Sequence, residues 1–349
     1  MFRRTVQRLQ SELSGVKSVV AWQKKLRESI QAPNAETRPL NIDDNSAIQL
    51  RNDAPQGPSW QLFDHCASIT RVYGLYERAI EDIVIEYLGL IPSILPTYAD
   101  LEEVIRSNHR TGVGHILQKW SPAKSMYSNL AEGAIATGLH NGLAGNPYVI
   151  LADAFLIDSD NYRVDTLNRL FGRMGLGDMF AGVRQADSVK KFCEISLAGT
   201  ETADSFLNEF VRRRNEVAHG AVDSVVGVTE VELYADFTML LVDSIAALLR
   251  KQILKTGCEH GRATLVGDVV RQWSNNVVGV EARASCVISV GTQLYVGVKH
   301  VHPVDVVSLR IVDDPKESIE LQPNMQFGAG LSAPVAKGSQ IYLWCGQPT

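Results

Sequence analysis

The sequence predicts a multidomain α plus β protein, with an all-helical bundle followed by a small C-terminal antiparallel β-barrel. Up to Cys258, apolar residues recur every three or four positions, which is the period of amphipathic helices. Beyond Gly261 the pattern changes to short runs rich in β-branched residues, broken by Gly, Asn, Asp and Pro. A chain of 349 residues is long enough for such a division into domains.

The composition is that of a globular protein, with 45% hydrophobic and 21% charged residues. The net charge of −5 means that any nucleic-acid surface must be local. The five cysteines are scattered without Cys-x-x-Cys spacing, which favours a reducing compartment over a disulfide framework. Without a signal peptide or an apolar run long enough to span a bilayer, we expect a cytoplasmic protein with no membrane contact.

Residues 1–58 are predicted to form a basic amphipathic helix, interrupted near Gly15, followed by a linker arm. The arm is indicated by prolines mixed with Asn, Asp and Gln: Pro33, Pro39, Pro55 and Pro58. The main interpretation is that the helix packs on the body of the protein. Contact of its basic side with RNA or a membrane surface is the alternative.

Residues 59–258 are predicted to form the helical bundle. Its strongest helix runs over residues 60–90, with an apolar stripe that includes Tyr73 and Tyr76 as core residues, and is expected to end at Pro92 and Pro96. Shorter helical patterns follow at 98–120, 127–142, 147–156, 163–175 and 177–196. A last long helix begins at a capping box, Thr229 to Glu232, and ends near Gly257.

The densest basic cluster lies in the helix between these patterns, as Arg212-Arg213-Arg214-Asn215, and three further residues separate it from His219-Gly220. Phe206, Phe210 and Arg214 are spaced by four, so Arg214 points partly into the apolar stripe, where a guanidinium needs a partner, an interface or a ligand. Asn215 and His219 share a face, whereas Arg214 and His219 lie about 140° apart on an ideal helix. If both act on one substrate, either the last turn is distorted or a second chain contributes.

Residues 262–349 contain six or so strand-like runs, which favours a small barrel or sandwich. Cys258, His260, His300 and His302 permit a zinc interpretation, but their one-residue gaps are not those of common zinc fingers. Likewise, His109, His115 and His140 have no partners at metal spacing. We therefore predict no metal and no cofactor.

The motif Arg214-Asn215-x-x-Ala218-His219-Gly220, together with Asn161-Tyr162-Arg163-Val164-Asp165 upstream, resembles the RiboL-PSP branch of the HEPN superfamily. Many HEPN domains are metal-independent ribonucleases. The resemblance covers roughly residues 60–254, so it implies an all-α HEPN helical bundle there.

The C-terminal region resembles the second-domain barrel of translational GTPases. The segments that carry this resemblance are Val266 to Val270, Val307 to Ile311, Phe327 to Leu331 and Pro334 to Tyr342. The chain contains no Gly-x4-Gly-Lys-Ser/Thr loop, so no nucleotide turnover is expected. Its near balance of acidic and basic residues favours a module that docks on protein, such as the translation machinery or a phage component, over a generic RNA clamp.

RNA carries its own nucleophile, the ribose 2′-hydroxyl, and a protein cleaves it by orienting that oxygen and moving two protons. The resemblance implies that Arg214, Asn215 and His219 are catalytic: Arg214 binds the phosphate, His219 exchanges a proton, and Asn215 holds the imidazole or the phosphate. Arg212 and Arg213 would attract the RNA backbone. Since one histidine cannot easily be both acid and base, a homodimer with a composite site is expected, as is typical of HEPN ribonucleases.

The expected function is therefore that of an endoribonuclease that leaves 2′,3′-cyclic phosphate and 5′-hydroxyl ends. Its setting would be prokaryotic antiphage defence or toxin action, with tRNA, mRNA or ribosome-associated RNA as substrate. Two alternatives stay open. The first is a non-catalytic HEPN scaffold that binds RNA or a partner protein and leaves any catalysis to another subunit. The second is an antitoxin or nucleotidyl-transfer partner that modifies or silences the motif. A purely structural interpretation pairs Arg214 with Glu77 or Glu81 and has His219 cap the helix.

Overall fold

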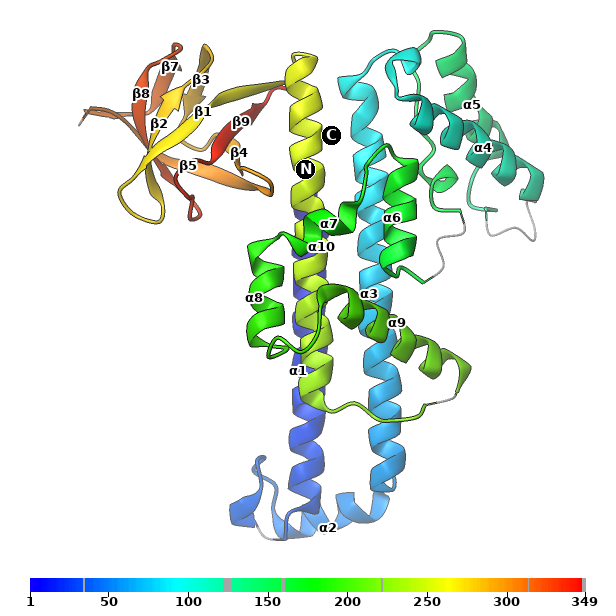
Figure 1. Cartoon of the computed structure of the whole chain (residues 1–349). Helices are drawn as coiled ribbons and strands as arrows, with labels where there is room; N and C mark the ends of the chain where they lie inside the picture. The colour runs from blue at the N-terminus through cyan, green and yellow to red at the C-terminus, as the bar shows by residue number, and fades with distance from the viewer. Residues whose placement is uncertain (34, 122–126, 158–160, 221, 313, 347–349) are drawn as a thin grey trace.

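The structure is a computed structural model that describes residues 1–33, 35–121, 127–157, 161–220, 222–312 and 314–346. Within these residues a helical N-terminal region is followed by a C-terminal six-stranded antiparallel β-barrel, which confirms the predicted fold class. In Figure 1 the barrel lies beside the upper end of the long helices, and both chain termini lie near that junction. No helix in this part of the chain is both long and apolar enough to cross a bilayer.

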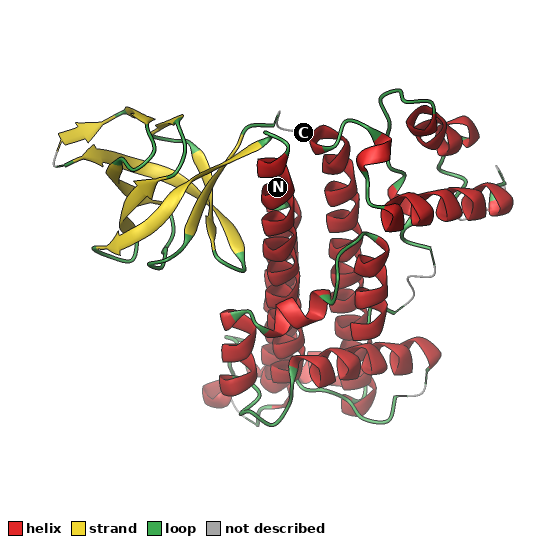
Figure 2. Cartoon of the chain, turned by 45° about the horizontal axis from the view of Figure 1, so that its top comes forward, coloured by secondary structure: helices red, strands yellow, loops and turns green. Residues whose placement is uncertain are grey.

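Three long helices form the centre of the helical region: α1 (Arg3–Gln31), α3 (Gly57–Ile94) and α10 (Val228–Glu259). All three pack on one another along their lengths, as Figures 1 and 2 show. The tyrosines of the α3 stripe, Tyr73 and Tyr76, are buried in the core as expected. The amphipathic stripes therefore meet at the centre of a bundle, which is where an apolar helix face is stable.

Two of the long helices differ from the expectation. The first helix is not interrupted at Gly15, because α1 is continuous from Arg3 to Gln31. Similarly, α3 continues past Pro92 and ends at Ile94, although a proline in a helix removes a hydrogen-bond donor. Within the expected linker arm, Asp43 caps a further helix, α2 (Asp44–Asp53), by accepting a hydrogen bond from the Ser46 N–H.

The shorter helices between α3 and α10 are α4 (Glu103–Lys119), α5 (Glu132–Leu143), α6 (Val164–Arg173), α7 (Met179–Arg184), α8 (Asp187–Ile195) and α9 (Ala203–His219). In Figure 1, α6, α7 and α9 lie in front of the long helices, α8 lies to their left, and α4 and α5 lie at the upper right. Single 3₁₀ turns occur at Ala35–Thr37, Tyr98–Asp100 and Ala152–Ala154. The helix expected over residues 147–156 is therefore reduced to one turn.

The barrel contains β1 (Ala263–Gln272), β2 (Val277–Ala282), β4 (Gln293–Gly297), β5 (Val301–Ile311), β8 (Gln326–Leu331) and β9 (Gln340–Trp344). Their order is β4-β9-β1-β2-β8-β5, and β5 pairs with β4 to close the sheet. The short strand β6 (Asp314–Lys316) pairs with the end of β5, while β3 (Cys286–Ser289) and β7 (Ser318–Leu321) form a separate two-stranded sheet. Closure removes free edges, which stabilises a sheet of this size.

The barrel is anchored on the last third of α10. Arg250 is 1% exposed and donates hydrogen bonds to the carbonyl oxygens of Met1 and Val301, each at 3.3 Å. One turn along the helix, Leu254 packs with the barrel residues Tyr295 and Tyr342. The barrel thus docks through a small apolar cluster and a buried guanidinium, whose pKa is lowered by burial.

Candidate functional site

The helix that carries the motif, α9, is fixed by its cap and by one apolar face. Thr202 and Ser205 form a reciprocal capping box at its N-terminus. Phe206 and Phe210 are buried, and the ring of Phe210 stacks on Tyr234 of α10 with centroids 4.8 Å apart. At the other end, Gly220 adopts φ 70°, a conformation in which glycine commonly ends a helix.

Arg214 points inward from this helix, as its spacing predicts, and is half-buried. Its guanidinium carbon lies 4.5 Å from the centroid of the Tyr73 ring on α3. Its Nη1 donates hydrogen bonds of 3.1 Å to the side-chain oxygens of both Asn161 and Asn215. Within the described residues these contacts are all with uncharged groups, so they orient the guanidinium without neutralising it.

Asn161 is itself held by α3 through the backbone of its neighbour Tyr162. The Tyr162 N–H donates to the Tyr73 hydroxyl at 3.0 Å, and the Tyr76 hydroxyl donates to the Tyr162 carbonyl at 2.8 Å. Burial raises the pKa of Tyr73 to about 12, with the Glu77 charge adding to the shift, so this hydroxyl keeps its proton. Sequence analysis missed Asn161 and Tyr73 as site residues, although Asn161 opens the upstream segment of the family resemblance.

The other two predicted catalytic residues lie on the same helix. Asn215 is half-buried and accepts the Arg214 hydrogen bond described above. His219 is exposed in the last turn of α9, and the helix remains continuous to this residue. The last turn is therefore not distorted so as to bring Arg214 and His219 onto one face.

Arg212 and Arg213, predicted to bind RNA, are engaged along the helix. Arg212 forms ion pairs with Glu209 and with Glu216, and Arg213 forms one with Glu209 at 2.8 Å. The hydrogen bond from Arg212, followed by the two positive charges, keeps the pKa of Glu209 below its usual value. The spacings of three and four residues could have revealed these pairs in the sequence. RNA binding by the two arginines stays a prediction.

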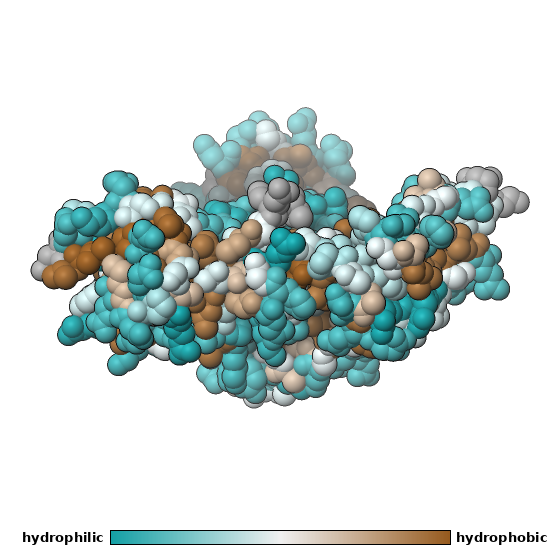
Figure 3. Space-filling model, turned by 90° about the horizontal axis from the view of Figure 1, so that it is seen from above, coloured by the Kyte–Doolittle hydropathy of each residue, from teal (hydrophilic) through white to brown (hydrophobic). Residues whose placement is uncertain are grey.

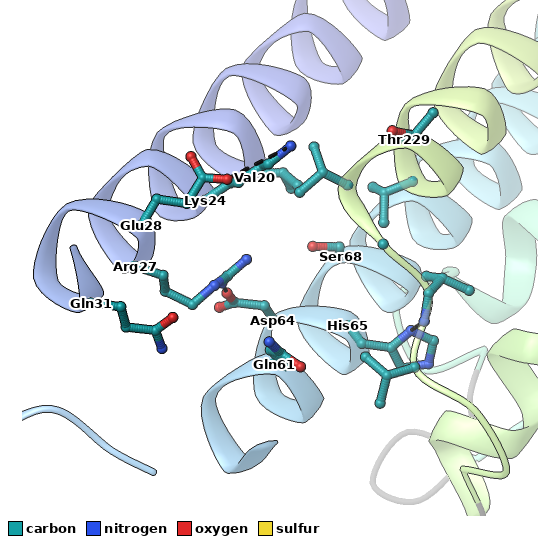
Figure 4. A pocket seen from close by; sticks show the side chains of 15 residues that line it. Val20, Lys24, Arg27, Glu28, Gln31, Gln61, Asp64, His65, Ser68 and Thr229 are labelled. Carbon is teal, nitrogen blue, oxygen red and sulfur yellow. Dashed lines mark hydrogen bonds and ion pairs between the residues drawn. The ribbon is translucent and has the colours of Figure 1, made fainter. Parts of the chain in front are cut away.

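A cavity of about 450 Å³ opens between α1, α3 and the segment before α10 (Figure 4). Arg27 and Asp64 form an ion pair in its wall. Beside them, the Nδ1 of His65 accepts a hydrogen bond from the Val226 N–H at 3.1 Å. Burial, and secondarily the charge of Arg213, lower the pKa of His65. None of the three predicted catalytic residues lines this cavity.

A second buried histidine, His109, lies in the core of the helical region. His109 is fully buried, with its Nδ1 3.1 Å from the Tyr98 hydroxyl and its Nε2 accepting a hydrogen bond from the Leu151 N–H. In the part of the chain that the structure describes, no three His, Cys, Asp or Glu side chains come together in a group that could hold a metal ion.

A helical domain with an arginine, an asparagine and a histidine in the last two turns of one helix has the arrangement of the HEPN class. The family model described as RiboL-PSP-HEPN matches residues 41–251, which is more than half of the chain. The chain therefore belongs to the RiboL-PSP-HEPN family, and this membership suggests an RNase-type function. No curated protein and no solved structure matches the chain. The resemblance of the barrel to translational GTPases is not supported by these comparisons.

Proposed function

We propose that the protein is a metal-independent endoribonuclease. The observation that carries this proposal is the environment of Arg214, a half-buried guanidinium that is positioned by a ring and two amide oxygens. A cation held by neutral groups keeps its charge available for an anionic ligand, and a guanidinium is well suited to bind a phosphate. Five residues later, the exposed His219 supplies a group that exchanges protons near neutral pH.

In the proposed reaction the ribose 2′-hydroxyl attacks the adjacent phosphorus and the 5′-oxygen leaves. One imidazole removes the proton from the 2′-hydroxyl, and a proton is delivered to the departing 5′-oxygen. Arg214 stabilises the charge that grows on the phosphate oxygens, and Asn215 maintains the orientation of Arg214. The products are a 2′,3′-cyclic phosphate and a 5′-hydroxyl end. No metal enters this scheme, because the attacking group is part of the RNA.

The two proton transfers call for a second imidazole, which we propose comes from a second copy of the chain. Arg214 and His219 lie on a continuous helix and therefore face about 140° apart. In a symmetric dimer the His219 of each copy can approach the Arg214 of the other, so that both sites become complete. Substrates of the proposed enzyme are tRNA, mRNA or ribosome-associated RNA, in antiphage defence or as a toxin.

The test is cleavage of total tRNA in the presence of EDTA, with analysis of the new RNA ends. His219→Ala is expected to lower the rate by roughly 10²- to 10⁴-fold. Arg214→Ala is expected to lower it by about 10²- to 10³-fold. His140→Ala is the matched control, since His140 is also exposed in the last turn of a helix, α5, and should leave the rate unchanged. Equal cleavage by the His219→Ala variant and the unaltered chain would overturn the proposal.

The alternative is a non-catalytic HEPN scaffold that binds RNA or a partner protein. Its support is the pairing of Arg212 and Arg213 with Glu209 and Glu216, which reduces the positive charge beside the motif. A scaffold predicts RNA or protein binding without new RNA ends in any of the variants. A mixing experiment separates the two functions further: Arg214→Ala and His219→Ala chains, each inactive alone, should regain partial cleavage together only if the site is shared between copies.

A further inference from the structure

The outer surface of the barrel contains a row of four residues on four neighbouring strands. Arg271 of β1 pairs with Gly279 of β2, which pairs with Gly328 of β8, which in turn pairs with Arg310 of β5. Directly paired residues point to the same face of a sheet. Because both arginines are exposed, this row lies on the outside of the barrel, with two glycines between two arginines.

Trp273 lies over the two glycines. It follows β1 and is 56% exposed, an unusual fraction for so large an apolar ring. A Cβ atom added at Gly279 would lie 3.1 Å from the Trp273 ring, and one added at Gly328 would lie 3.8 Å from it. The absence of side chains at these positions therefore lets the indole rest on the backbone of β2 and β8. One face of the ring is supported and the tryptophan remains accessible to a ligand.

The charge around this ring is positive. The guanidinium carbon of Arg271 lies 5.8 Å from the Trp273 centroid, and the Cβ of Arg310 lies 3.7 Å from the position of a Cβ on Gly328. Neither arginine forms an ion pair with a carboxylate in the described part of the chain. With strands about 4.8 Å apart, their backbones are separated by roughly 14 Å. Glu281, two residues beyond Gly279 on β2, bounds the patch on one side.

We propose that this face, consisting of Arg271, Trp273 and Arg310, binds single-stranded RNA. A base stacks on the exposed indole, and phosphates on either side are bound by the two guanidinium groups. Aromatic rings beside cationic side chains are the usual means by which proteins hold unpaired nucleotides without reading their sequence. The balanced charge of the whole barrel does not oppose this, because two carboxylates on the patch strands or beside them are paired with other cations, Asp268 with Arg283 and Asp314 with Lys316, which leaves Glu281 as the acidic border of the patch.

Figure 3 shows that apolar residues also gather over the barrel, at the left of that view. Exposed apolar side chains of the barrel include Val277, Val307 and Val312. Valines could equally contact a protein, but a flat ring with an arginine on either side matches the stacked base and flanking phosphates of a single RNA strand, which favours RNA as the occupant. The site is separate from the Arg214 motif and does not depend on cleavage by it.

The test is the affinity of the full-length chain for a fluorescent oligouridylate, measured by anisotropy in the His219→Ala background so that the probe remains intact. Trp273→Ala should weaken binding by about 5- to 150-fold, whereas Trp273→Phe should retain most of it. The double variant Arg271→Ala/Arg310→Ala should reduce the slope of log K against log salt concentration by about 1.4, since each phosphate contact on a single strand contributes about 0.7.

Two matched controls remove an equivalent group elsewhere. The double variant Asp268→Ala/Arg283→Ala removes a barrel arginine together with the carboxylate that it pairs with, and Trp22→Ala removes a tryptophan of α1 that is 54% exposed. Both should leave the affinity unchanged. Equal affinity of Trp273→Ala and its parent would overturn the proposal and favour a protein as occupant. An equal loss from the controls would overturn it by showing that RNA binding does not depend on this face. Because binding is measured without cleavage, a failure of the nuclease proposal leaves this result interpretable.

Discussion

The hydroxyl of Tyr73 offers a direct test of how the site is built. Replacing Tyr73 by Phe keeps the ring beneath Arg214 but removes the acceptor of the Tyr162 N–H, a buried hydrogen bond of 3.0 Å. A buried donor that loses its partner costs about 1–3 kcal/mol. If the local opening of the segment becomes easier by that free energy, exchange of the Tyr162 amide hydrogen should accelerate by about 5- to 150-fold.

The assay is hydrogen exchange followed by mass spectrometry of a peptide that covers residues 161–167. Tyr148→Phe serves as the control, because it also removes a buried hydroxyl, one that donates to the Leu95 carbonyl at 2.7 Å, in another part of the protein. In that variant the exchange of residues 161–167 should not change. Unchanged exchange in Tyr73→Phe would refute the view that α3 positions Asn161, and with it Arg214, through the Tyr162 backbone.

Three further changes should have distinct effects. Acidification from pH 7 to pH 5 should lower the free energy of unfolding by about 2 kcal/mol through His109. Burial lowers the pKa of His109 in the folded protein from 6.5 to about 4, so the unfolded chain binds the proton first as the pH falls. Urea unfolding at both pH values should show this loss in the parent and not in His109→Gln. Gly220→Ala should destabilise the end of α9 by about 1–2 kcal/mol, because the φ of 70° is unfavourable for a residue with a Cβ. No atom lies within 4 Å of the added Cβ, so this cost comes from the backbone conformation alone, and Gly220→Asn should cost less. Thermal unfolding of the two variants measures the difference. Arg250→Met should leave two buried carbonyls unpaired and loosen the barrel, which faster proteolysis near Gly261 would reveal; equal cleavage of both chains would contradict the anchoring role.

Much of the helical region follows from local pattern. The apolar stripe of α3 depends on spacings of three and four residues, and the structure contains it as expected. The inward direction of Arg214 was also predictable, since the helical phase depends only on its distance from Phe206 and Phe210. The failures at Gly15 and Pro92 have a common cause: packing between long helices outweighs a single unfavourable residue.

The sequence by itself determined the fold class, the family motif and the phase of its residues, because these depend on neighbours along one helix. Only the tertiary structure decided what Arg214 touches, since Tyr73 lies on another helix and Asn161 lies 53 positions away. In the barrel, the strands can be predicted from β-rich runs in the sequence. The register that places two glycines between two arginines, however, arises from pairing among four strands. Contacts between distant segments depend on how the whole chain packs, so the spacing of residues along one helix or strand does not predict them.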